Sequence, residues 1–319
     1  MITLAIQRFD RTAALHTGSV TIRDTMVMQV PPGTGVAGVI DGVFDAAEMP
    51  LAHYVFLQDI GAPFTAVPVF PDRLFIHQYV YTRPDTGIRS TGELRGRRVL
   101  VPQYFMTASI WQRGMLKNEH GIEPGEIQWH CTSSERDKRM RLPQGVKVTV
   151  NPGPHLGVER LLDGTVDCLM TEGTPLLADG DRDKIVRLYP DVHNLQRDFY
   201  RKTGFHFIVH VIVVSNKAVE ERPDLLEELC AAFDQAKDTA YRQLRNERMT
   251  SLPLMRSYLD ETSEMFGDDP WPYGVERNRN ELDRFLAYAH DQGLIRNRLT
   301  PESLFESRVR QFPFRAKLI

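Results

Sequence analysis

Side chains that can donate a proton or bind a carboxylate recur where predicted strands end. Histidine and glutamate supply the acid and base groups that proton transfer requires. Arginine, hydroxyl and amide groups bind carboxylates, and the planar fork of a guanidinium matches a carboxylate directly. The candidate proton donors are Glu48, His77 and His206. The candidate substrate-binding residues are Asp10, Arg11, His53, Arg73, Gln103, Thr107, Ser109, Glu172 and His210.

These residues lie beside strands that the pattern of apolar residues predicts. The expected strands are residues 2–6, 27–30, 43–46, 65–69, 98–101, 147–150, 166–170, 185–188 and 207–214. In an open α/β sheet the ligand lies outside the carboxyl ends of the strands, where helices begin. Gln103, Thr107 and Ser109 occupy such a place, and the free amides at a helix start can bind a carboxylate. We therefore expect several of the candidates to face one ligand site.

Each candidate also has a structural interpretation. Glu48 and Asp10 could be helix caps or surface carboxylates, as most carboxylates are. Arg73 could simply pair with its neighbour Asp72. His53 lies at helical spacing among apolar residues, which is typical of a core histidine. For the remaining histidines, His77, His206 and His210, we expect that at least one faces the ligand.

The alternation of strands and helices predicts an α/β protein with mixed, mainly parallel sheets flanked by helices. Helices are expected at residues 36–41, 50–57, 156–162, 223–244 and 275–292, and from residue 106 onward. No low-complexity linker interrupts the chain, so strands are expected to cross between two lobes. The expected first lobe is 1–95 with 212–319 and the second is 96–211, with a substrate cleft between them.

Composition limits the partners. A formal net charge of −3 supplies no basic field, which argues against nucleic acid. The three cysteines form an odd set without CxxC spacing, which argues against a zinc site and a disulfide framework. No window approaches the ~18 apolar residues of a membrane span, and the opening MITLAIQRFDR does not match a signal peptide. We expect a cytoplasmic protein without membrane contact, with homo-oligomers possible.

Cofactor motifs are weak. The string GTGVAG at residues 33–38 matches the dinucleotide pattern GxGxxG, but Asp41 and Gly42 cut short the helix that should bear the pyrophosphate. Walker A, HExxH and GxSxG motifs are missing from the sequence. The scattered histidines and carboxylates lack paired ligand spacing, so we expect no cofactor and no metal.

Several segments together resemble one enzyme family. They are RFDRT (8–12), DAAEMPLAHY (45–54), PVFPDRLFIH (68–77), VPQYFMTASIWQRGML (101–116), RDFYRKTGFHFIVH (197–210) and FGDDPWPYG (266–274). Across nearly the whole chain they resemble 4,5-dihydroxyphthalate decarboxylase and its relatives. The resemblance implies a two-lobed fold like that of type II periplasmic binding proteins, working in the cytoplasm on an aromatic carboxylate.

The resemblance also implies a reaction, the non-oxidative loss of CO2 from a hydroxylated aromatic acid. The ring carbon must be protonated before CO2 departs, so a general acid is required. We expect His77 or His206 to supply this proton and Arg73 or Arg11 to bind a substrate carboxylate, whereas Trp271 is expected to pack a turn. Two alternatives stay open: a binding protein without catalysis, and another lyase on the same fold, such as one in menaquinone assembly.

Overall fold

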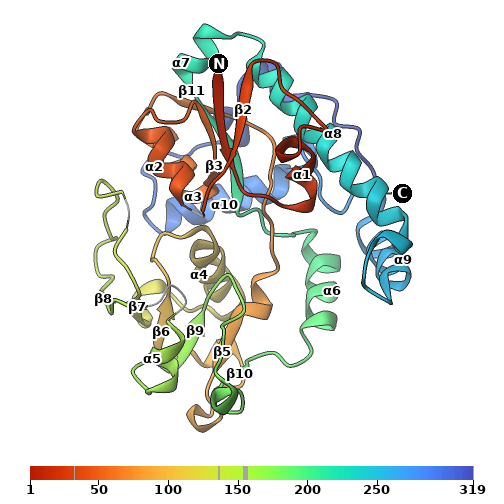
Figure 1. The fold of residues 1–319 in the computed structure, drawn as a ribbon. Coiled ribbons are helices and arrows are strands. Elements are labelled where there is room, and N and C mark those ends of the chain that lie inside the picture. The colour runs from red at the N-terminus through yellow and green to blue at the C-terminus, as the bar shows by residue number, and fades with distance from the viewer. Residues whose placement is uncertain (32, 136, 154–156, 319) are drawn as a thin grey trace. The chain divides into compact units, whose positions relative to one another are not determined.

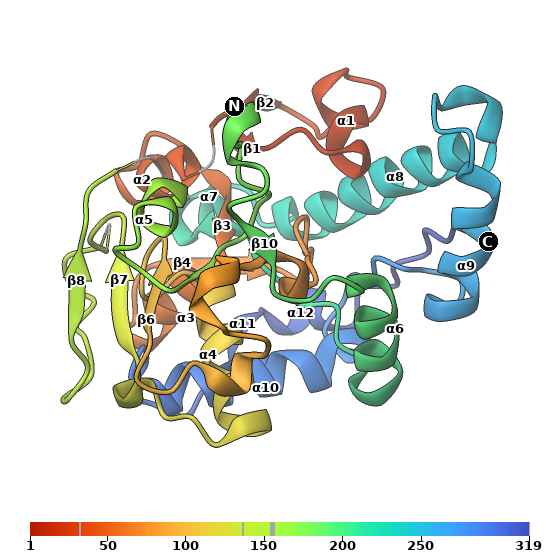
Figure 2. The same ribbon diagram turned by 90° about the horizontal axis from the view of Figure 1, so that it is seen from below.

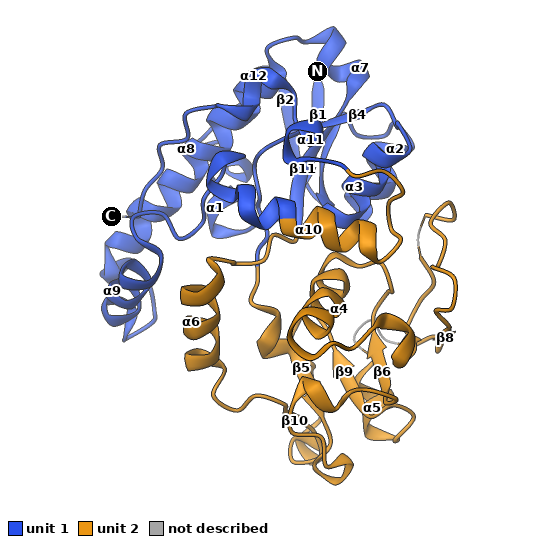
Figure 3. Ribbon diagram, turned by 180° about the vertical axis from the view of Figure 1, so that it is seen from behind, with its two compact units in different colours: residues 1–73, 210–283, 299–319 blue, residues 74–209, 284–298 orange. Residues whose placement is uncertain are grey.

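The chain folds into two compact units in a computed structural model, which describes residues 1–31, 33–135, 137–153 and 157–318 (Figures 1 and 3). Unit 1 comprises residues 1–73, 210–283 and 299–319, and unit 2 comprises residues 74–209 and 284–298. Each unit contains one mixed sheet flanked by helices, as the alternation of apolar segments predicts.

The sheet of unit 1 has the strand order β2-β1-β3-β11-β4. Its strands are β1 (Ile2–Ile6), β2 (Thr25–Gln29), β3 (Ala46–Pro50), β4 (Phe64–Val67) and β11 (His210–Ser215). β1 is parallel to β2 and β3, whereas β11 is antiparallel to both β3 and β4. The run Val211, Ile212, Val213 and Val214 is fully buried, so the returning strand forms part of the core.

Several helices of unit 1 pack on this sheet, and others lie in the C-terminal part of the chain. They are α1 (Asp10–His16), α2 (Thr34–Ile40), α3 (Leu51–Asp59), α7 (Asn216–Glu221), α8 (Leu225–Arg245), α9 (Met255–Phe266), α11 (Pro301–Leu304) and α12 (Ser307–Arg310). α8 buries its apolar face and packs along α1 (Figure 2). α10 (Arg279–Asp291) begins in unit 1 and ends in unit 2.

The sheet of unit 2 has the order β10-β5-β9-β6-β7-β8. Its strands are β5 (Val80–Thr82), β6 (Arg98–Val101), β7 (Gln128–Cys131), β8 (Val148–Val150), β9 (Cys168–Met170) and β10 (Val186–Arg187). Its helices are α4 (Thr107–His120), α5 (Val158–Leu162) and α6 (Val192–Thr203). β6 is parallel to β7 and β9, and β5 is antiparallel to β9 and β10.

The two units differ from the expected lobes in residues 74–95 and 284–298, which pack in unit 2. The physical reason for the first segment is the pairing of β5 with β9, which places residues 80–82 in the second sheet. The boundary before the returning strand lies at residues 209 and 210 rather than 211 and 212.

Some element boundaries also differ from expectation. The third strand is expected at 43–46, but the amides of Val43 and Phe44 bond to the carbonyl of Gly38 at the end of α2. β3 therefore begins only at Ala46, and Glu48 lies inside the strand rather than after it. The helix expected at 156–162 appears as α5, and residue 156 lies outside the described residues. Among the helices described, none has the length and apolar character needed to span a membrane.

Candidate active site

A hydrogen bond joins Glu48 and His210 in the sheet of unit 1. In the antiparallel pairing of β3 and β11, Glu48 lies directly opposite Ile212. His210 is two residues from Ile212, so its side chain is on the same face and is a diagonal neighbour of Glu48. The Nδ1 atom of His210 is 2.5 Å from Oε1 of Glu48. The register of two strands that are distant in sequence thus creates a carboxylate–imidazole pair.

Other groups hold the carboxylate of Glu48 in place. The Gln7 backbone amide, just after β1, donates to Oε2 at 2.9 Å, and the Gln7 side-chain amide donates to Oε1 at 3.1 Å. A Cβ atom at Gly35 of α2 would lie only 3.0 Å from the Glu48 carbonyl oxygen, so glycine permits the helix to approach β3. The Glu48 side chain is only 3% exposed. A carboxylate fixed in this way orients the imidazole and stabilises its protonated form.

Asp72 provides a second carboxylate near the same ring. Its Oδ2 atom lies 3.7 Å from Nδ1 of His210, and its carbonyl oxygen accepts from the His210 backbone amide at 3.2 Å. The side chain of Asp72 is 25% exposed and that of His210 is 15% exposed. Both carboxylates therefore lie near the same nitrogen, Nδ1, of a partly exposed imidazole, which suits a group that exchanges protons.

Arg11 lies in the same unit, at the start of α1. Its guanidinium carbon is 4.2 Å from the centre of the Phe9 ring and 3.9 Å from the Trp271 ring. Its Nε donates to the carbonyl oxygen of Pro71, and Nη1 pairs with Asp10 at 3.1 Å. No described residue accepts a hydrogen bond from its Nη2. The guanidinium is thus held rigidly while part of its donor edge stays available for an anion.

Arg73, which the sequence predicts as a possible substrate clamp, is enclosed within unit 1. Its side chain is 1% exposed and pairs with Glu281 at 3.3 Å. It also donates to Asn278 and, at 2.8 Å, to the carbonyl oxygen of Pro272. Burial lowers the pKa of its guanidinium, and the Glu281 carboxylate counteracts this effect. These contacts favour a structural role, because a buried guanidinium needs its carboxylate partner.

Two other predicted residues of unit 1 have surroundings that match their structural interpretations. His53 is 8% exposed within α3 and makes an edge contact with Phe56, at 6.4 Å between ring centres. Asp10 begins α1, where its carboxylate accepts from the Arg11 amide at 2.7 Å. A carboxylate in the first turn of a helix is favoured by the helix dipole.

In unit 2, His77 lies in apolar surroundings. Its ring centre is 4.7 Å from that of Phe199 and 6.2 Å from that of Phe207. Burial lowers the pKa of His77 to about 4. Its Nδ1 has no hydrogen-bond partner among the described residues, and His77 and Gln112 help to line a small cavity of about 20 Å³. The N–H of a neutral imidazole is a very weak acid, so an imidazole that is neutral at pH 7 is a poor proton donor, which argues against His77 as the acid.

The remaining candidates of unit 2 are His206, which lies between α6 and β11, and four residues that follow β6 or β9. His206 stacks on Phe75 at 4.7 Å between ring centres. Gln103 follows β6 and donates to the carbonyl oxygen of Ser134 at 2.8 Å. Thr107 and Ser109 are fully buried at the start of α4, and Ser109 Oγ has no partner among the described residues. Glu172 follows β9 and is half-buried.

Among the predicted site residues, the structure pairs Glu48 with His210 and Asp10 with Arg11. Three residues that contact these pairs were not predicted as site residues: Gln7 bonds to Glu48, Asp72 lies beside His210, and the ring of Trp271 lies against Arg11. Gln7 directly follows the expected strand 2–6, and Asp72 directly precedes the candidate Arg73. Their positions near the ends of predicted strands could have identified both residues as site candidates.

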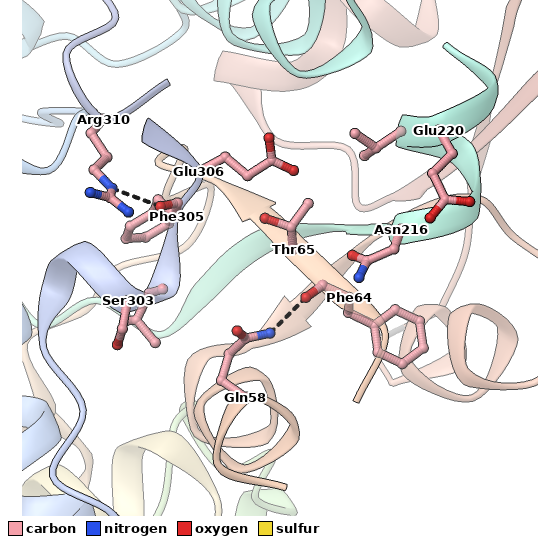
Figure 4. A pocket seen from close by; sticks show the side chains of 11 residues that line it. Gln58, Phe64, Thr65, Asn216, Glu220, Ser303, Phe305, Glu306 and Arg310 are labelled. Atoms are coloured by element: carbon pink, nitrogen blue, oxygen red, sulfur yellow. Dashed lines mark hydrogen bonds between the residues drawn. The ribbon is translucent and has the colours of Figure 1, made fainter. Parts of the chain in front are cut away.

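A separate hollow of about 430 Å³ lies in unit 1, next to the start of β4 and the end of β11 (Figure 4). It is therefore at the opposite end of β11 from His210. Its lining residues are Gln58, Phe64, Thr65, Asn216, Val219, Glu220, Ser303, Leu304, Phe305, Glu306 and Arg310. None of the predicted site residues lines this hollow. In the part of the chain that the structure describes, no three His, Cys, Asp or Glu side chains are grouped to hold a metal ion.

Known proteins resemble the chain in sequence. A 4,5-dihydroxyphthalate decarboxylase of Comamonas testosteroni is 31% identical over 315 residues, which cover 95% of this chain and 96% of that enzyme. The chain belongs to the 4,5-dihydroxyphthalate decarboxylase family. A second member of the family, from Pseudomonas putida, is 32% identical over 168 residues, or 51% of this chain and 65% of its own length. No family model matches the chain.

Solved structures similar to this decarboxylase-family chain establish its fold. The periplasmic aliphatic sulphonate binding protein SsuA of Escherichia coli superposes with a TM-score of 0.54 at 13% identity, covering 96% of this chain and 92% of that one. The alkanesulfonate-binding SsuA of Xanthomonas axonopodis pv. citri also gives 0.54, at 11% identity, covering 96% and 97%. The fold is that of type II periplasmic binding proteins, as the resemblance in the sequence implies.

Proposed function

We propose that this chain is a non-oxidative decarboxylase of a hydroxylated aromatic acid such as 4,5-dihydroxyphthalate, with His210 as the proton donor. The observation that carries the proposal is the hydrogen bond between Nδ1 of His210 and the Glu48 carboxylate, in a member of a decarboxylase family. With Nδ1 held by Glu48, we assign proton transfer to Nε2. The proposal replaces His77 and His206 as donors by His210, which was predicted to bind substrate, and it changes the role of Glu48 from candidate donor to the residue that orients the acid.

The proposed reaction exchanges a carboxylate of the substrate for a proton. In 4,5-dihydroxyphthalate one hydroxyl is para to each carboxylate-bearing carbon. Once that hydroxyl is deprotonated, its electron density reaches the para carbon, which takes a proton from the imidazolium. The bond to the carboxylate then breaks, its electron pair restores the aromatic ring, and CO2 leaves. Loss of CO2 leaves the phenolate, which takes back from solvent the proton that the hydroxyl gave up, and the product is 3,4-dihydroxybenzoate. The imidazole also regains a proton from solvent, and no oxidant is needed.

Arg11 is the proposed partner of a substrate carboxylate. Its guanidinium lies against the rings of Phe9 and Trp271 and is fixed through Nε to the carbonyl oxygen of Pro71, the residue before Asp72. Asp72 in turn contacts His210, so the proposed anion site and the proposed acid belong to adjoining segments of unit 1. A carboxylate held by a rigid guanidinium would keep the ring in one orientation during proton transfer. The free thiols of all three cysteines support a cytoplasmic location, which the proposal includes.

The alternative is a binding protein that takes up an aromatic acid without reacting with it, which the fold also supports. Such a protein needs an anion-binding residue such as Arg11 but has no use for a general acid. The Glu48–His210 pair, with Asp72 beside it, therefore favours the enzyme.

CO2 release tests the proposal. Purified protein, stripped of metal and then assayed with and without added divalent cations, is offered 4,5-dihydroxyphthalate, 4-hydroxyphthalate and phthalate. We expect CO2 from the first, and saturable binding without CO2 from phthalate, which lacks the hydroxyl that supplies electron density. Binding of all three acids with no CO2 under any condition would favour the non-catalytic alternative.

A further inference from the structure

Trp271 covers one face of the Arg11 guanidinium. The guanidinium carbon lies 3.9 Å from the centre of the indole ring, and it lies 4.2 Å from the centre of the Phe9 ring. An arginine side chain has many rotamers, and binding a carboxylate requires that one of them be selected. The two rings and the bond from Nε to Pro71 together select that rotamer.

Trp271 is itself fixed by three hydrogen bonds. Its indole Nε1 donates to the carbonyl oxygen of Phe70 at 2.8 Å. Its backbone amide donates to Oδ1 of Asp269 at 3.1 Å, and its carbonyl oxygen accepts from Nζ of Lys237 at 2.9 Å. The residue is thus anchored on both its backbone and its ring.

The anchor is an ion pair that is fully buried. Lys237 and Asp269 lie 3.0 Å apart, and both side chains are 0% exposed. Tyr241 and Arg277 also donate to Asp269, each at 2.8 Å. Burying such a pair is costly, and a role in fixing one arrangement of neighbouring groups is a recognised reason to retain it. The neighbouring group fixed here is Trp271.

We propose that Trp271, anchored by Lys237 and Asp269, is a positioning residue that aims the Arg11 guanidinium at a carboxylate of the substrate. This inference rests on the proposed function and adds a determinant of substrate binding. It predicts that Trp271 acts on recognition of the acid through Arg11 and leaves the proton transfer from His210 largely unchanged. The aromatic segment 270–273 then has a functional reason beyond packing.

The test compares Trp271→Leu with Trp271→Phe. Loss of the aromatic face should raise KM for 4,5-dihydroxyphthalate, and Kd for unreactive phthalate, by about 5- to 30-fold, with kcat within about threefold. Phenylalanine keeps an aromatic face and should recover most of the loss. Trp129→Leu is the matched control: it removes a buried tryptophan ring of unit 2 that packs against Tyr104 and should leave KM unchanged.

A double-mutant cycle with Arg11→Ala decides whether the effect passes through Arg11. In the Arg11→Ala background, Trp271→Leu should change phthalate affinity by less than about twofold. An equal change in both backgrounds, or a fall in kcat without a change in KM, would overturn the inference. If Arg11→Ala itself left phthalate affinity unchanged, the carboxylate site of the proposed function would fail, which is a distinguishable result.

Discussion

Replacement of His77 by glutamine should make the free energy of unfolding of unit 2 depend less strongly on pH below neutrality. Burial lowers the pKa of His77 from its ordinary 6.5 to about 4 in the folded chain. Between these values the unfolded chain binds a proton that the folded chain does not, so stability falls as the pH falls. The contribution is fully present above about pH 6.5 and is lost progressively toward pH 4.

The magnitude follows from the two pKa values. The difference between 6.5 and about 4, at about 1.4 kcal/mol per pH unit, corresponds to roughly 3 kcal/mol over the full range. Roughly 2 kcal/mol of this should already be lost between pH 7 and pH 4.5. His77→Gln carries no titrating ring, so its free energy of unfolding should fall by that much less over the same interval.

Urea unfolding followed by tryptophan fluorescence gives the required measurement. Trp111 and Trp129 both lie in unit 2 and are buried, so they report on the unit that contains His77. His193→Gln, an exposed substitution on α6, is the matched control and should leave the pH dependence unchanged. If wild type and His77→Gln lost equal stability between pH 7 and pH 4.5, His77 would have an ordinary pKa. The argument against it as the proton donor would then fail.

Other predictions concern the surroundings of Glu48 and the buried pair of Lys237 and Asp269. Glu48→Gln should lower kcat by roughly 10² to 10⁴, because an amide stabilises the imidazolium of His210 poorly. Phthalate binding, measured by calorimetry, should stay within a few-fold of wild type. An unchanged kcat would show that Glu48 does not support the proton donor. Gly35→Ala should destabilise the chain by roughly 1–3 kcal/mol and also lower kcat, because the new Cβ would lie 3.0 Å from the Glu48 carbonyl oxygen; wild-type stability in urea would count against it. Lys237→Met should cost roughly 3–5 kcal/mol in the same measurement, since it leaves Asp269 buried without its cation; a loss below 1 kcal/mol would show that Arg277 suffices.

The fold class follows from the sequence because apolar periodicity is local. The strands at Ile2–Ile6 and Arg98–Val101 lie where the apolar runs predict them. Tertiary contacts decide the remaining boundaries. β3 starts later than expected because Val43 and Phe44 bond back to α2, and residues 74–95 join unit 2 because β5 pairs with β9.

The candidate site was predictable in its residue types and only partly in its pairings. Proximity to strand ends identified Glu48, Arg11 and His210, but the Glu48–His210 contact depends on a strand register between residues 162 apart. The choice among histidines depends on burial, which local sequence does not reveal: both His77 and His210 stand among apolar residues. Likewise, only the structure shows that Arg73 is enclosed by Glu281 and its neighbours.

The central claim, that His210 protonates the ring carbon that loses CO2, is tested most directly by His210→Asn with 4,5-dihydroxyphthalate in D2O. NMR of the wild-type product should show 3,4-dihydroxybenzoate with one deuterium at the vacated carbon. The variant should bind phthalate normally and release CO2 roughly 10² to 10⁴ times more slowly. Wild-type turnover in the variant, or binding without CO2 in the wild type, would contradict the account.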